Sequence, residues 1–308
     1  MAGGQTGVAM LTRRVYAPHS DFAAPARPTA GLTRLALGFI LIEATYATVM
    51  HLLDAALLPL PLDWTDGFYY GTTRLGLIAQ LASFGLLGAA VILTVRVLHH
   101  RGPLSLLGRG PGVRQTLYAL MAVLALFTAI ELMPPWWSME GMTLNNPLSW
   151  LLLLPLSLGA LTVQVASEEI LYRGYIQQQL AARFSSPWIW LIGPNLLFAV
   201  AHWEDGVPWT EAAQYAIWAF CFGLAASDLT ARTGSLGAAV GFHLANNVYA
   251  FLVFGEVGAN DSGLALMMFP PMDSLLPPEP VPLVTVSFGI ELLTLVLMWL
   301  AVRLVLRR

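Results

Sequence analysis

The sequence contains no lysine and little charge of any kind. Only 11% of its 308 residues are charged, whereas soluble domains carry roughly 25%, and 57% of the residues are hydrophobic. The single cysteine, Cys221, excludes an intramolecular disulfide. Without lysine there is no Walker A motif, and a net charge of −3 with dispersed arginines argues against nucleic-acid binding. These absences leave the class of integral membrane proteins.

Eight apolar segments have about the length of helices that cross a bilayer. They predict an all-α, polytopic membrane protein: a bundle of about eight transmembrane helices with a polar intramembrane cavity, forming one domain over residues 31–308. The spans are expected at residues 35–53, 75–98, 115–132, 148–165, 187–201, 212–229, 235–254 and 283–305.

The arginines between the spans collect on one side of the predicted bundle. Since basic residues beside spans prefer the cytoplasmic side, both termini are predicted to be cytoplasmic. The Arg- and Ala-rich composition indicates a bacterial inner-membrane protein. Residues 1–30, rich in Gly, Pro and Ala and without an apolar signal segment, are expected to be a disordered tail. The connection 255–282 is expected to be a lid or a linker, with its apolar LALMMF patch along the outer membrane surface.

Charged side chains stand out in the stretch SEEILYRGY, which follows a run without any charge. Glu169 and Arg173 are four residues apart, which is the spacing of an ion pair on one helix face. Glu168 points about 100° away, so it is free to face a cavity and act as a general base. The simpler alternative is an ordinary helix end with exposed charges at the cytoplasmic surface.

Two later spans carry polar pairs at helical spacing. Phe198 and His202, like His243 and Asn247, are separated by four residues and therefore share a helix face. A lone histidine or asparagine in a span more often forms a hydrogen bond between helices than takes part in catalysis. Together with Glu168, these side chains offer a base and hydrogen-bond donors for an oxyanion, which amide hydrolysis requires.

The three motifs resemble those of the CAAX protease and bacteriocin-processing family of intramembrane proteases, the type II CAAX endopeptidases. That family shows EExxxR, then FxxxH, then HxxxN, and here the set runs in the same order from Ser167 to Asn247. The core catalytic helices are then expected at about residues 148–254.

The resemblance implies a role for each matched residue. Glu168 and His202 activate a water molecule, and His243 and Asn247 hold the oxyanion. The supporting residues would be Glu169 and Arg173, which brace the first glutamate, and Phe198, which packs the helix of His202.

The resemblance also implies a substrate and raises the question of a metal. The substrate would be a membrane-embedded or lipid-anchored protein or peptide. The family is often described as metalloproteases, and Glu168, His202 and His243 could ligate zinc with one open position. Because the sequence has no HExxH motif and no further ligand nearby, a metal-free, glutamate-dependent mechanism is favoured.

Two other function classes remain open on the sequence. A non-catalytic membrane protein of the same fold, binding a peptide or conferring immunity, would tolerate conservative loss of Glu168. A proton-coupled transporter would depend on Glu43, which falls near one helical stripe with His51 and Asp54.

Hydropathy places the two catalytic residues far apart in depth, because Glu168 follows the inner end of its span and His202 ends its own span at the outer side. For them to meet, residues 163–182 must stay inside the membrane as a long or bent helix. Pro155 and Pro187 are the expected bends at its edges.

Overall fold

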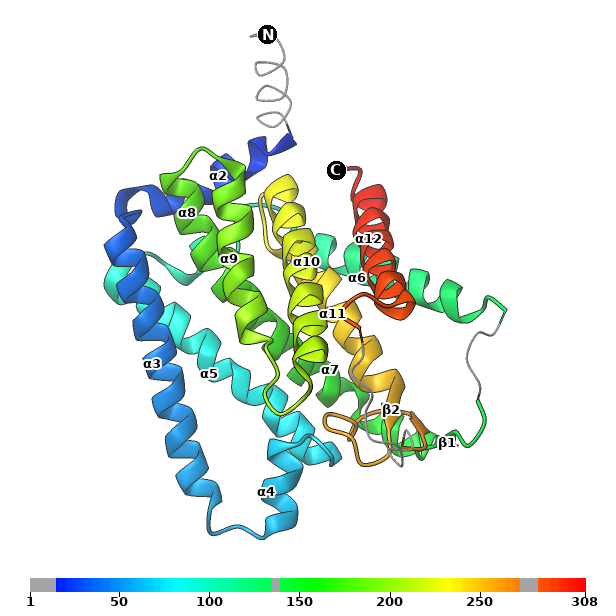
Figure 1. Ribbon diagram of the computed structural model, residues 1–308. Helices are drawn as coiled ribbons and strands as arrows, with labels where there is room; N and C mark the ends of the chain where they lie inside the picture. The colour runs from blue at the N-terminus through cyan, green and yellow to red at the C-terminus, as the bar shows by residue number, and fades with distance from the viewer. Residues whose placement is uncertain (1–14, 135–138, 272–281) are drawn as a thin grey trace.

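The computed structural model describes residues 15–134, 139–271 and 282–308 of the chain. They form a bundle of helices with one small sheet at its end (Figure 1). Five helices are long and apolar enough to cross a membrane, which confirms the predicted all-α, polytopic class. These are α3 (Leu32–Leu57), α5 (Arg74–His99), α6 (Gly112–Glu131), the continuous helix Pro147–Arg183 and α12 (Val286–Leu306).

Helices coincide with the remaining predicted spans as well. α9 (Pro187–Ala201) is short and apolar, and α10 (Trp209–Thr233) follows it. α11 (Gly237–Val248) continues into the π-helix η4 (Tyr249–Val253). Each of the eight predicted segments therefore lies on a helix in the described part of the chain.

The helix of 37 residues consists of α7 (Pro147–Glu169), the π-helix η3 (Ile170–Gln177) and α8 (Gln178–Arg183). At about 1.5 Å per residue it is roughly 55 Å long, well beyond the ~30 Å of a hydrocarbon core. Glu168 and Arg173, near its middle, are consequently buried in the bundle. This long helix is the arrangement that the sequence requires if Glu168 is to meet His202.

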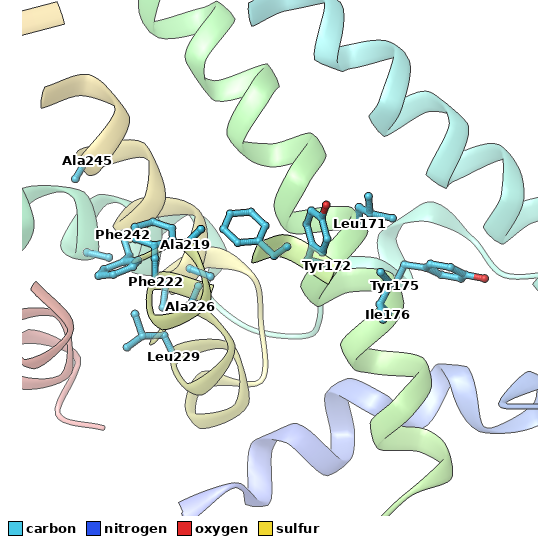
Figure 2. Packing of buried hydrophobic residues seen from close by; sticks show 14 of the residues in the cluster. Leu171, Tyr172, Tyr175, Ile176, Ala219, Phe222, Ala226, Leu229, Phe242 and Ala245 are labelled. Atoms are coloured by element: carbon cyan, nitrogen blue, oxygen red, sulfur yellow. The ribbon is translucent and has the colours of Figure 1, made fainter. Parts of the chain in front are cut away.

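Small residues let the helices approach closely. A Cβ at Gly88 of α5 would lie 2.7 Å from Ser167 Oγ of α7, and one at Gly241 of α11 would lie 2.2 Å from the Thr116 carbonyl oxygen of α6. Such close backbone contacts are typical of membrane bundles. Around η3 the packing is aromatic, with Tyr172 on one side of the cluster and Phe222 on the other (Figure 2).

The N-terminal segment differs from the prediction of a disordered tail. Residues 15–30 carry α2 (Ala17–Ala23) and the 3₁₀ helix η1 (Ala24–Thr29), in which Phe22 and Ala26 are fully buried. Tyr16 Oη donates to Asp228 Oδ1 (2.7 Å), and Gln178 Nε2 donates to the Phe22 carbonyl (2.7 Å). These polar anchors compensate for the segment's modest apolar content. Residues 1–14 lie outside the described residues.

The connection predicted to be a lid or a linker contributes strands instead. β1 (Thr143–Leu144), β2 (Phe254–Glu256) and β3 (Met267–Phe269) form a sheet in the order β1-β3-β2, antiparallel between β1 and β3 and parallel between β2 and β3. Leu264 and Ala265 are buried rather than spread on a membrane surface, and Leu264 belongs to a hydrophobic cluster with residues of α5 and η4 such as Leu77 and Leu252. Residues 272–281 of this connection lie outside the described residues.

The polar stripe of α3 is largely on its outer side. Glu43 and His51 are exposed. Asp54 accepts a hydrogen bond from Tyr69 Oη (2.8 Å) of α4 (Leu62–Tyr69), so it anchors the turn between the two helices.

Docking of the N-terminal segment can be measured by cysteine labelling. In a Cys221→Ser background, we expect Ala26→Cys to react with a water-soluble maleimide about tenfold or more slowly than the exposed control Ser20→Cys. Equal rates at the two positions would contradict the packing of α2 and η1.

The same docking should depend on pH through His19. The ring lies 4.3 Å from that of Trp190, and burial lowers the pKa of His19 to about 3. A detached segment titrates near pH 6.5, so below that pH the detached form binds a proton that the docked form does not. The ratio of the labelling rate of Ala26→Cys to that of Ser20→Cys should therefore rise as the pH is lowered from 7 to 5, by at most about tenfold per pH unit. His19→Phe should abolish this rise, and a flat ratio in the otherwise unmodified chain would refute the role of His19.

Candidate active site

A buried ion pair lies at the middle of the long helix. Arg173 Nη1 is 2.9 Å from Glu169 Oε1, and both side chains are 0% exposed. Arg173 Nη2 also donates to Asn195 Oδ1 on α9 and to the Gly223 carbonyl on α10, each at 3.2 Å. The guanidinium lies 4.8 Å from the centre of the Phe198 ring. The charge is thus compensated by groups from three helices, as a desolvated cation requires.

The π-helix η3 spreads its side chains over different neighbours. Tyr172 packs edge-on against Phe198, with ring centres 4.9 Å apart. Tyr175 Oη lies 2.9 Å from His99 Nε2 on α5. Arg173, between them, faces α9 and α10. π-Helical turns are frequent at functional sites because they redirect side chains in this way.

Glu169 also fixes His243 on α11, since His243 Nδ1 lies 2.9 Å from Glu169 Oε1. A carboxylate only accepts, so the geometry assigns the proton to Nδ1 and leaves Nε2 as the free ring nitrogen. This differs from the predicted brace. Glu169, which is itself held by Arg173, bonds His243 rather than Glu168, because Glu169 points towards α11.

Glu168 is held by a residue that sequence reasoning missed. Gln164 Nε2 donates to Glu168 Oε1 (2.7 Å), and Gln164 Oε1 accepts from Asn247 Nδ2 (2.8 Å). Glu168 Oε2 is buried, has no hydrogen-bond partner among the described residues and lies 3.7 Å from His243 Nε2. The signal that could have identified Gln164 is its place one helical turn before Glu168 in a run without charge.

His202 ends α9 beside this cluster. Its Nδ1 lies 2.8 Å from the Phe198 carbonyl oxygen, which can only accept, so Nε2 is again the free nitrogen. The Phe198 ring lies 4.2 Å from the His202 ring and 6.4 Å from the His243 ring. Phe198 therefore contacts both imidazoles, and no hydrogen bond of the described residues joins His202 to Glu168 directly.

The structure thus brings all the residues implied by the resemblance into one region of the bundle. Glu168, His243 and Asn247 are 4–7% exposed, which places their polar groups inside the protein. A separate cavity of about 630 Å³, lined in part by Arg27 and Arg183, lies at the α2 end of the bundle and does not include them.

A zinc site would need several ligand side chains close together. Among the described residues, no three His, Cys, Asp or Glu side chains are grouped closely enough to hold a metal ion, and Glu168, His202 and His243 form no such group.

Comparison with known proteins identifies the segment that carries these residues. Residues 148–249 match the family model described as Type II CAAX prenyl endopeptidase Rce1-like. The predicted resemblance is confirmed for this segment. The Rce1-like segment includes α7, η3, α8, α9, α10 and α11, the helices that supply Gln164 and all the residues of the three motifs.

One curated relative is the Uncharacterized protein YyaK of Bacillus subtilis (strain 168), which is 26% identical over 160 residues. The alignment covers 49% of this chain and 51% of YyaK, so the chain spans about half the length of that relative. No solved structure matches the chain.

Gly223 provides a test of the arginine site. A Cβ there would lie 2.3 Å from Asn195 Oδ1. Asn195 has little freedom to move, because its Nδ2 donates to the Leu191 carbonyl (2.6 Å) and to Ser227 Oγ (2.9 Å). We expect Gly223→Ala to lower the free energy of unfolding by about 1–3 kcal/mol, measured by reversible denaturation in mild detergent.

The matched control is Gly289→Ala on α12, where an added Cβ meets nothing within 4 Å. This substitution should leave stability unchanged or slightly raised, because alanine favours a helix over glycine. Equal stability of the two variants would contradict the close contact at Gly223.

Proposed function

We propose that the chain is an intramembrane endopeptidase that hydrolyses a peptide bond of a membrane-associated protein or peptide. The observation that carries this proposal is Glu168 Oε2, which is buried without a hydrogen-bond partner among the described residues and lies 3.7 Å from His243 Nε2. Glu169 Oε2 also lacks a hydrogen bond, but Glu169 is paired with Arg173. A buried carboxylate without such a cation in an apolar bundle is costly, so Glu168 calls for a functional reason. The Rce1-like match of the same segment supports a protease.

In the proposed reaction Glu168 acts as the general base. It removes a proton from water as the water oxygen bonds to the scissile carbonyl carbon, with His202 orienting the water through Nε2. The proton then passes from Glu168 to the leaving amine as the C–N bond breaks. The products are a carboxylic acid, which keeps the second water proton, and a free amine; the acid proton then passes to the amine or to solvent, and Glu168 regains its starting charge.

The developing oxyanion needs hydrogen-bond donors. Asn247 Nδ2 carries two hydrogens, of which one is donated to Gln164. The second is available to the oxyanion. We assign the other contact with the oxyanion to His243, whose ring is held by the Glu169 carboxylate at Nδ1 and whose Nε2 lies 3.7 Å from Glu168 Oε2.

The membrane setting is part of the proposal. α2 and the last turn of α12 lie at the same end of the bundle (Figure 1), as expected if both termini face the cytoplasm of a bacterial cell. Several outward side chains of α3 besides Glu43 and His51, such as Ile40 and Leu52, are apolar and suit a lipid boundary. A substrate anchored in that membrane, by a lipid or by a helix, would reach the site at high local concentration.

The decisive assay uses the purified full chain in liposomes with quenched fluorogenic peptides, including one with an S-farnesyl cysteine near its C-terminus. We expect cleavage by wild type and a loss of about 10²–10⁴-fold in Glu168→Gln, which keeps the size but removes the base. His243→Ala should also be impaired. A chelator in parallel reactions measures metal dependence separately, and undiminished activity is expected.

The matched control is Glu291→Gln, a glutamate on the exposed face of α12, which should cleave like wild type. Equal background in wild type and Glu168→Gln, with both proteins folded, would refute the protease and favour a peptide-binding or immunity protein.

A further inference from the structure

Gln164 links two residues of the proposed mechanism that lie on different helices. It is buried on α7, one turn before Glu168, and its side-chain amide makes a 2.7 Å hydrogen bond to Glu168 and a 2.8 Å hydrogen bond to Asn247 on α11. Both ends of the amide are therefore occupied by side chains of the site. A glutamine that served only to fill space would not need two partners of this kind.

The direction of these bonds is dictated by chemistry. A carboxylate can only accept, so Gln164 must turn its NH₂ group towards Glu168 and its oxygen towards Asn247. Asn247 must then present its own NH₂ group, and its Oδ1 accepts from Asn246 Nδ2 (3.2 Å). The charge of Glu168 thereby sets which end of the Asn247 amide enters the site.

The same bond sets which oxygen of Glu168 is free. Oε1 is occupied by Gln164, whereas Oε2 is left without a partner among the described residues and faces His243. Without this bond the carboxyl group could rotate and exchange its two oxygens. Gln164 therefore separates a held oxygen from a basic oxygen.

We propose that Gln164 is a positioning residue that aligns the water-activating oxygen of Glu168 with the oxyanion-binding amide of Asn247. This inference rests on the proposed protease function, and it adds to the matched motifs a residue that lies outside all three of them. Its effect is expected on the chemical step rather than on substrate binding.

The first test compares Gln164→Leu with Thr162→Val in the fluorogenic peptide assay. Thr162 is the matched control, because it lies on the exposed face of the same helix and its hydroxyl donates to the Leu158 carbonyl (2.7 Å) of that helix. We expect Gln164→Leu to lower kcat about 10–100-fold with little change in KM, and Thr162→Val to match wild type. An equal melting temperature in both variants excludes misfolding.

Two readouts separate positioning from mere packing. Gln164→Leu combined with Asn247→Ala should be no worse than the more severe single variant, because both act through one link. Gln164→Glu, which donates only when protonated, should regain activity as the pH falls. Additive losses, or no such gain in Gln164→Glu, would overturn the proposal.

A second test does not depend on activity. Infrared difference spectroscopy follows the carboxylate band that disappears in Glu168→Gln, and the frequency of this band should change in Gln164→Leu, because Glu168 loses a hydrogen-bond donor. An unchanged band refutes the link between Gln164 and Glu168. Absence of cleavage by wild type, with the band shifted, refutes the protease while the link stands.

Discussion

The architecture of this protein depends on the burial of one guanidinium. Arg173 cannot lose its proton, and it is fully enclosed in a bundle whose surroundings are apolar. Its partners are Glu169, one turn earlier on the long helix, Asn195 on α9 and the Gly223 carbonyl on α10. Removing a partner from such a pair typically costs about 3–5 kcal/mol. The three helices are therefore held in one relative position, and Glu169 extends the constraint to α11 through His243.

The two adjacent glutamates have different contacts, because consecutive residues of an α-helix point in directions about 100° apart around its axis. Glu169 points towards Arg173 and His243 and has its charge compensated. Glu168 points towards Gln164, makes no ion pair with an arginine among the described residues, and has its Oε2 3.7 Å from His243 Nε2. Glu169 is therefore suited to holding the helices together, and Glu168 to accepting a proton in the proposed reaction. The proposed catalytic role therefore belongs to Glu168, and the structural role belongs to its neighbour Glu169.

Much of this arrangement could be predicted from the sequence where a local rule applied. Apolar length located the helices, and the i, i+4 spacing identified the Glu169–Arg173 pair. The contacts of Gln164 and Asn195 could not be predicted, because they depend on which helices pack together. The docking of residues 15–30 was also missed, since composition describes a segment alone whereas Asp228 and Gln178 supply its anchors from elsewhere.

The central claim is that Glu168 activates water and forms no covalent bond with the substrate. Single-turnover cleavage in ¹⁸O-water, followed by mass spectrometry of product and protein, tests it directly. The account predicts ¹⁸O in the new carboxylate of the product and none in Glu168. Label in Glu168, with only ¹⁶O in the product, would show that the glutamate is the nucleophile and would contradict the account.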